Sequence, residues 1–253
     1  MTHAHRELLA PSRRGAAWFA VILGLLLVSA TSSRADVMTF AQFTQINVGD
    51  QNFVYSNNNT SADFNTITGG NPILLGIADW VRPTGLASSQ DAHLFLSAST
   101  ASAVAVSGTT LSQAFPIPTN TIRILLDTPF RGHSNFLTVT FTGHLSGEQN
   151  THSGNFQASD ASVPPDIVTY SSDVIDVSGF IEHSFALSFS SILTAGGQGL
   201  QVAPNGFYES FTTSGSGTFD AAVIPEPPSL LLAGMATLAF AGFGLWRKRL
   251  QTQ

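Results

Sequence analysis

Between residues 36 and 224, apolar and polar side chains alternate one by one in several short runs. In FLTVTFTGHL, for example, Leu137, Val139 and Phe141 fall on one face and threonines fall on the other. Successive side chains of a strand point to opposite faces of its sheet, so this period of two predicts half-buried β-strands. Three further runs repeat the pattern: TIRILLD (121–127), DVIDVSGF (173–180) and HSFALSFSSI (183–192).

Clusters of Gly, Pro, Asn and Ser separate these runs, as is typical of turns. No stretch between the two ends of the chain has a 3.6-residue period with helix caps, although PILLGIADWV (72–81) fits either a short helix or a buried strand. Short strands with such turns predict an all-β domain, an antiparallel β-sandwich or jelly roll, over residues 36–222. The turn clusters are SNNNTSADFN, ITGGNP, FPIPTN, SGEQNTHSGN, DASVPPD, TAGGQG and APNGF.

Aromatic residues in this span are mostly phenylalanines at alternating positions, which predicts that they form the core. Exposed Trp and Tyr side chains would be expected on a glycan-binding surface, and the span offers only Trp80 and three tyrosines. In GFYESF, Tyr208 has the opposite parity to Phe207 and Phe211, so we expect Tyr208 to face outward. This is a thin basis for glycan binding, which stays open as an alternative.

The first 35 residues have the three zones of a secretory signal peptide. A basic start with Arg13 and Arg14 precedes the apolar run AVILGLLLV, and Ser33 and Ala35 then supply small residues for cleavage between Ala35 and Asp36. An uncleaved anchor helix is the alternative. The short apolar run disfavours it, because a membrane span needs about 20 apolar residues.

The last 31 residues, 223–253, contain three parts in order. Pro225, Glu226 and Pro227 come first, and their prolines prevent a helix from continuing out of the domain. Eighteen uncharged residues follow, Ser229 to Trp246, and as a helix they would be about 27 Å long, enough to span a bilayer core. Arg247, Lys248 and Arg249 then predict a cytoplasmic C-terminus. A plain membrane anchor would explain the apolar and basic parts but not the prolines.

This order of parts closely resembles the PEP-CTERM sorting signal of exported proteins in Gram-negative bacteria. The resemblance covers Val223 to Gln251 and leaves the central domain unassigned. It implies that exosortase, a multi-pass membrane enzyme encoded beside exopolysaccharide genes, recognises Pro225, Glu226 and Pro227. Leu230 to Leu245 would span the membrane, and Arg247 to Arg249 would retain the tip in the cytoplasm. The tail would then be removed.

Charge and composition exclude several functions for the central span. It carries three arginines and fourteen acidic residues, a net charge of −11, so it lacks the basic surface that nucleic acid requires. The chain has no cysteine, which excludes thiol catalysis, disulfides and cysteine-based zinc sites.

Candidate catalytic and metal-ligating residues are few and scattered. His144 and His152 flank a Gly-containing turn and would bind a metal if they met on adjacent strands, but solvated histidines are the simpler interpretation. Four aspartates around VPPD fit a solvated acidic face, and a calcium site is the alternative interpretation. There is no G-x-S-x-G elbow, so a Ser/His/Asp hydrolase would need distant residues to assemble. The four aspartates are Asp160, Asp166, Asp173 and Asp176.

Together these patterns predict a non-enzymatic protein that needs no metal or cofactor. The secretion machinery would export it through the inner membrane, and the tail would anchor the domain transiently in the periplasm. Exosortase would then release it to the cell surface or the extracellular matrix, where exopolysaccharide is the candidate partner. A glycan-binding module of the same matrix and a secreted hydrolase are the alternatives.

Overall fold

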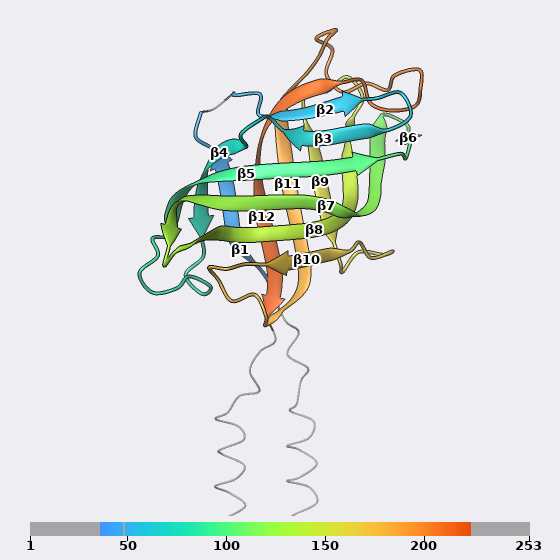
Figure 1. Cartoon of the computed structure of the whole chain (residues 1–253). Coiled ribbons are helices and arrows are strands. Elements are labelled where there is room, and N and C mark those ends of the chain that lie inside the picture. The colour runs from blue at the N-terminus through green and yellow to red at the C-terminus, as the bar shows by residue number, and fades with distance from the viewer. Residues whose placement is uncertain (1–35, 48, 224–253) are drawn as a thin grey trace, which may run out of the picture. The chain divides into compact units, whose positions relative to one another are not determined.

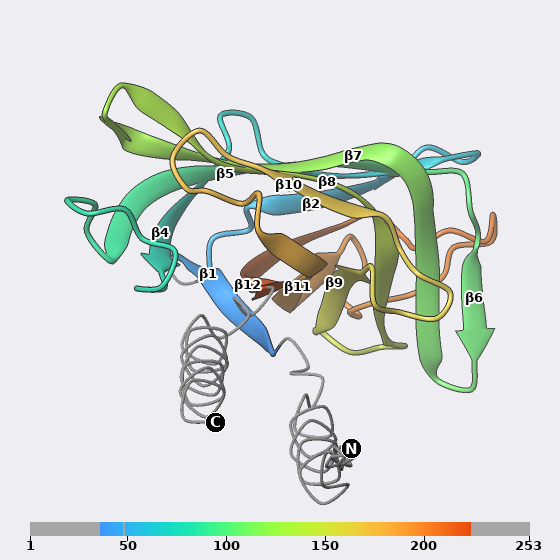
Figure 2. The same ribbon diagram turned by 90° about the horizontal axis from the view of Figure 1, so that it is seen from below.

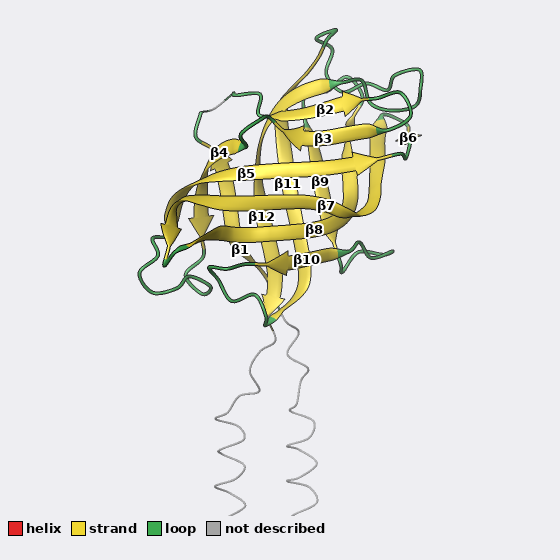
Figure 3. Ribbon diagram, in the orientation of Figure 1, coloured by secondary structure: helices red, strands yellow, loops and turns green. Residues whose placement is uncertain are grey.

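The structure is a computed structural model that describes residues 36–47 and 49–223 (Figure 1). Over these residues it contains strands, turns and loops but no helix (Figure 3), and every strand pairing is antiparallel. The all-β antiparallel class predicted from the sequence is therefore confirmed. The predicted signal peptide and the apolar tail segment lie outside the described residues.

Twelve strands make up the described domain. They are β1 (Val37–Gln45), β2 (Phe53–Asn57), β3 (Ala62–Thr66), β4 (Asn71–Ile77), β5 (Ser89–Thr100), β6 (Val104–Ser107), β7 (Thr110–Phe130), β8 (His133–Glu148), β9 (Gly154–Ser159), β10 (Val168–Ser171), β11 (Phe180–Thr194) and β12 (Phe211–Val223).

One continuous sheet folds over into two layers whose strands run crosswise to each other (Figures 1 and 2). The first layer has the strand order β2-β3-β5-β7-β8-β10, and the second has the order β4-β1-β12-β11-β9-β8-β7-β6. The long strands β7 and β8 run through both layers. Pairing of β4 with β5 and of β12 with β2 joins the layers again at other places.

The bend that carries β7 from one layer to the other coincides with FPIPTN, which the sequence predicts to be a turn. The β7–β8 register shifts between Phe115 and Asn120, and Pro116 and Pro118 between them have no N–H to donate to a ladder. The amide of Asn120 is buried and donates 3.3 Å to the Phe115 carbonyl, which satisfies one polar group left by the interrupted ladder. FPIPTN therefore bends one long strand instead of ending it.

Aromatic side chains fill the space between the layers, as the alternating phenylalanines predicted. Ten phenylalanines and two tyrosines are less than 2% exposed. Phe64 lies at the centre, with its ring centroid 5.1 Å from Phe189 and 5.7 Å from Phe156. Burying such a side chain contributes about 1.5–3 kcal/mol, and edge-on ring pairs add about 0.5–1.5 kcal/mol. The interior of this cysteine-free domain is therefore its main source of stability.

Most of the predicted strands are confirmed, and one is wrong. FLTVTFTGHL, TIRILLD and HSFALSFSSI lie in β8, β7 and β11 with their apolar faces buried, and PILLGIADWV begins with strand β4. DVIDVSGF instead forms most of the loop before β11. The Ser172 hydroxyl accepts the N–H groups of Val174 and Ile175 at 3.0 Å, and these local bonds replace strand pairing.

The prediction that Tyr208 faces outward is also wrong. Tyr208 is fully buried, stands edge-on to Tyr55 at a centroid distance of 5.7 Å, and donates its hydroxyl to the Leu145 carbonyl at 3.2 Å. Phe207 next to it is 5% exposed. Both neighbours are buried because residues 204–207 form a turn and a bend, and Tyr208 makes only an isolated bridge with Val202. The parity rule applies to a continuous strand, which this segment is not.

Candidate functional site

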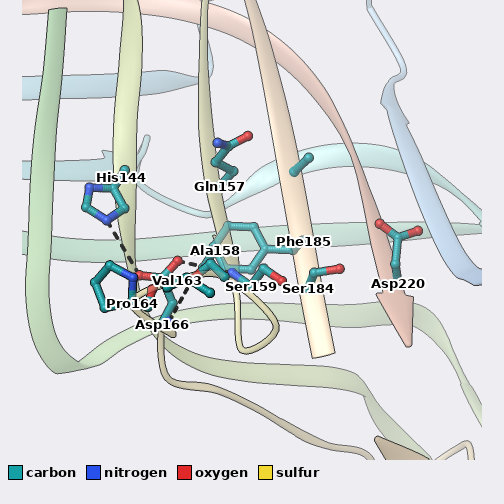
Figure 4. Close-up of a pocket in the computed structure, with 12 residues that line it drawn as sticks. His144, Gln157, Ala158, Ser159, Val163, Pro164, Asp166, Ser184, Phe185 and Asp220 are labelled. Atoms are coloured by element: carbon teal, nitrogen blue, oxygen red, sulfur yellow. Dashed lines mark hydrogen bonds and ion pairs between the residues drawn. The ribbon is translucent and has the colours of Figure 1, made fainter. Parts of the chain in front are cut away.

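A groove of about 420 Å³ lies on the outer face of the second layer, beside the loop that joins β9 to β10 (Figure 4). Four neighbouring strands, β8, β9, β11 and β12, supply its floor, and the 160–167 loop supplies one wall. His144 and Asp166 stand at one end of the groove and Asp220 stands at the other (Figure 4). Serine hydroxyls, the Gln157 amide and parts of Phe185 and Ala158 line the space between them.

The groove continues into a polar surface because the outward positions on these strands are mainly Ser, Thr, Asn, Gln or Ala. Strand register places these side chains in rows that cross the layer. One row runs Gln42, Thr218, Ala186, Gln157 and His144. A second row runs Ser216, Ser188, Asn155 and Ser146. Both rows offer hydrogen-bond donors and acceptors with little bulk above the backbone.

Two His–Asp pairs hold the 160–167 loop against the strands. The Nδ1 atom of His183 on β11 lies 2.8 Å from the Asp160 carboxylate, and the Nε2 atom of His144 on β8 lies 3.6 Å from the Asp166 carboxylate. Asp166 also accepts the Ser159 N–H at 3.2 Å. The loop is thus fastened near both of its ends, which gives the groove a defined wall.

Tyr170 on β10 supports the same region from the interior. Its hydroxyl donates to the Ser184 carbonyl and lies 3.2 Å from the Asp220 carbonyl, so it links β10 to both β11 and β12. Its ring stands edge-on to His183 with a centroid distance of 5.0 Å. Burial raises the pKa of the Tyr170 hydroxyl well above its usual value, so the phenol stays protonated and remains a donor.

The described residues do not assemble the catalytic or metal sites that the sequence left open. Within residues 36–47 and 49–223, no described hydrogen bond joins a serine hydroxyl to a histidine ring, and no three His, Asp or Glu side chains gather as metal ligands. His144 pairs with Asp166, whereas Nδ1 of His152 lies 2.7 Å from the Ile192 carbonyl, so the two histidines serve different contacts.

The four aspartates considered for calcium also make separate contacts, three of them through their carboxylates. Asp160 and Asp166 pair with different histidines. The Asp173 N–H donates to the Asn135 carbonyl at 3.1 Å, and the Asp176 carboxylate accepts the Ser178 hydroxyl at 2.7 Å. That hydroxyl and the Ser178 N–H hold the pKa of Asp176 below its usual value. The arrangement fits hydrogen bonding by a polar surface better than coordination of one ion.

The residues predicted for sorting lie outside the described residues. These are Ala35 on one side and Pro225, Glu226, Pro227, Arg247, Lys248 and Arg249 on the other. Asp36 is described, is exposed, and directly precedes β1. Among the described residues, no helix is long and apolar enough to cross a membrane.

Sequence reasoning missed the groove, although the serines, Gln157 and His144 are visible as polar positions of alternating runs. Which of these positions become neighbours depends on pairings such as His144 with Gln157 and Ser184 with Asp220, which join distant segments. The loop wall depends in turn on Asp160 and Asp166 reaching histidines on other strands. In the sequence itself, the only signal of a polar surface is that serines and threonines occupy the polar positions of the alternating runs.

Comparison of the chain with family models, with curated proteins and with solved structures gives no match.

Proposed function

We propose that the chain is an exported surface or extracellular-matrix protein that exosortase processes through its C-terminal segment. The observation that carries the proposal is the order of parts after Val223: Pro225, Glu226 and Pro227, then eighteen uncharged residues, then Arg247 to Arg249. A plain anchor accounts for the last two parts only. The signal-peptide pattern of the first 35 residues agrees with the apolar segment and basic triplet of the tail. Together they fit one topology, with the domain in the periplasm before processing.

The fold supports this proposal through the placement of its two ends. Val37 in β1 pairs with Ala222 in β12, so the chain enters and leaves the domain side by side. In the sequence, Asp36 directly precedes β1, and β12 ends at Val223, two residues before Pro225. Cleavage at both segments would therefore free the domain without removing any strand that the core requires.

Replacing Pro225-Glu226-Pro227 by three alanines tests the proposal in the native host. Alanine favours helix and barely changes insertion of an apolar segment, so a plain anchor would behave like the parent. We expect the substituted protein to stay in the membrane at its larger mass while the parent appears outside it with a shortened C-terminus. Equal fractionation of the two proteins would contradict the proposal. Ser229→Ala, beside the motif, is the matched control.

The groove favours a second candidate function, the binding of a glycan of the same matrix. Its hydroxyls, the Gln157 amide and the Asp166 and Asp220 carboxylates are groups that hydrogen-bond to sugar hydroxyls. The domain's net charge of −11 disfavours an anionic polysaccharide and points to an uncharged glycan.

Calorimetry with an uncharged host polysaccharide tests this candidate. Gln157→Ala, in the groove, should weaken binding several-fold, because one buried hydrogen bond contributes about 0.5–1.5 kcal/mol. Thr140→Ala, on the outward side of β8 in the other layer, is the control and should bind like the parent. Absence of heat with the parent protein would remove the candidate and leave the sorting proposal untouched.

A further inference from the structure

One end of the domain exposes large apolar side chains beside the start of β1 and the end of β12. Val37 is 52% exposed and Met38 is 41% exposed at the start of β1, where they pair with Ala222 and Ala221 near the end of β12. Trp80, 40% exposed, packs on Phe180 with a centroid distance of 5.6 Å, and Phe180 pairs with Val223, the last residue of β12. We call Val37, Met38 and Trp80 the terminal collar.

The loop that carries Trp80 is held in place by two of the domain's three arginines. Arg82 contacts the Asp79 carboxylate at 2.5 Å and donates to the Leu86 carbonyl at 2.7 Å. Arg131, from the turn between β7 and β8, donates to the Thr84 carbonyl at 3.1 Å. Trp80 is therefore presented from a braced loop, and two cationic groups of a strongly acidic domain lie on or against that loop.

The sequence limits how far the collar can be from a bilayer that holds the tail. Six residues, 224–229, separate Val223 from Leu230, where the uncharged segment begins its membrane-spanning part. Seven residue steps span at most about 25 Å even when fully extended. The end of β12, and with it the collar, is thus tethered within a short reach of the membrane surface.

We propose that the terminal collar rests on the bilayer surface while the tail spans the membrane, an inference that rests on the proposed sorting function. Trp is favoured at the interface because its ring is apolar and its N–H remains able to hydrogen-bond. Arg131, which forms no ion pair with a carboxylate among the described residues, adds attraction to lipid phosphates. Because the tether raises the effective concentration to the millimolar range, weak contacts suffice for docking.

This contact would orient the domain so that Pro225, Glu226 and Pro227 lie at the membrane surface, where a membrane-embedded enzyme can reach them. It would also be reversible. Three apolar side chains without a covalent tether bind a bilayer weakly, and the domain's charge of −11 opposes anionic lipids. Removal of the tail therefore releases the domain.

Tryptophan fluorescence measures this contact directly, because Trp80 and Trp246 are the only tryptophans of the exported chain 36–253. The chain is reconstituted in phosphatidylcholine vesicles that contain lipids brominated near the headgroup or deep in the acyl chains. Trp246→Phe leaves Trp80 as the reporter, and Trp80→Phe leaves Trp246. We expect shallow bromines to quench Trp80 more strongly than deep bromines do, and Trp246 to be quenched as well.

The quenching of the two tryptophans tests the docking proposal and the sorting proposal separately. Quenching of Trp246 without quenching of Trp80 would show an inserted tail and a free collar, which overturns the docking proposal alone. No quenching of either would show that the tail does not insert, and both proposals would fall.

A second pair of variants guards against a folding artefact. With Trp246→Phe as background, Val37→Ser with Met38→Ser should reduce Trp80 quenching at least twofold, whereas Val106→Ser with Leu193→Ser, at exposed sites elsewhere, should not. Far-UV circular dichroism confirms that each variant is folded. Equal loss of quenching in both pairs would contradict the collar's role.

Discussion

The inner and outer faces of β11 and β12 carry side chains of opposite character. The inner face carries Phe185, Leu187, Phe189 and Phe219, all at most 3% exposed, and each ring contacts other rings. The outer face of the same strands carries mainly small hydroxyl side chains in rows. Alternation along one strand thus separates the residues that stabilise the domain from those that are free to serve binding.

Truncating the interior ring with the most aromatic contacts should give the largest loss of stability. This substitution tests whether the inner faces stabilise the domain. Phe64→Ala removes a ring that contacts five other aromatic rings, and such truncations cost about 3–5 kcal/mol of the free energy of unfolding. Urea unfolding of the domain measures the loss. Ser188→Ala on the outer face should change stability by no more than about 0.5 kcal/mol. Similar losses in the two variants would contradict the division of roles.

A single methyl group on the inner side of β12 should have the next largest effect. A Cβ at Gly217 would lie 2.6 Å from the Leu187 Cδ2 atom and 2.7 Å from the Phe43 Cε1 atom. Because a close-packed interior cannot absorb that overlap, Gly217→Ala should cost about 1–3 kcal/mol. Ser216→Ala next to it points outward and is the control. A Gly217→Ala protein as stable as the parent would show that this part of the interior has room to adjust.

Alkaline pH should weaken the interior through its buried tyrosines. Burial raises the pKa of Tyr55 to about 12, and its hydroxyl donates a hydrogen bond to the Oε1 atom of the buried Gln113 at 2.8 Å. Between pH 10 and 12 the unfolded chain has lost this proton and the folded chain has kept it, so stability falls as pH rises, by about 1.4 kcal/mol per pH unit for this group.

Urea midpoints between pH 9 and 11.5 measure this fall. Tyr55→Phe should lessen its steepness relative to the parent, and Tyr208→Phe should do the same because burial raises the pKa of Tyr208 too. A midpoint that does not depend on pH in this range would contradict the assignment.

The smallest effect on stability is expected from a substitution in the groove. His144 is half exposed and lies 3.6 Å from Asp166, and solvent-exposed ion pairs of this kind contribute about 0–1 kcal/mol. His144→Ala should therefore leave the unfolding free energy within about 1 kcal/mol of the parent. A larger loss, measured in the same urea experiment, would place the groove wall among the structural parts of the domain.

The same contrast explains what the sequence predicts well. Runs such as HSFALSFSSI predict both a strand and its buried face because burial of Phe185, Leu187 and Phe189 alone determines the alternation. Prediction failed where local hydrogen bonds or turns replace strand geometry. Ser172 converts DVIDVSGF into a loop, and the turn before Tyr208 removes the meaning of parity there.

The groove was beyond sequence-based prediction for a different reason. Its walls combine His144, Ser184 and Asp220 from strands far apart in the chain, and only the register of those strands brings them together. FPIPTN illustrates the same limit, because two prolines predict an interruption but not whether the chain turns back or bends between layers. Topology of this kind depends on long-range packing, which local patterns do not specify.

Mass spectrometry of the C-terminal peptide in the native host, with and without its exosortase, distinguishes a processed tail from a permanent anchor. We expect protein recovered from the cell surface or medium to lack roughly the last 25–30 residues when the enzyme is present, because cleavage near Pro225 removes the apolar segment and the basic tip. Without the enzyme, the protein should stay in the membrane with Gln253 intact. Surface-localised protein that keeps Gln253 in the presence of the enzyme would contradict the sorting function and leave a plain membrane anchor.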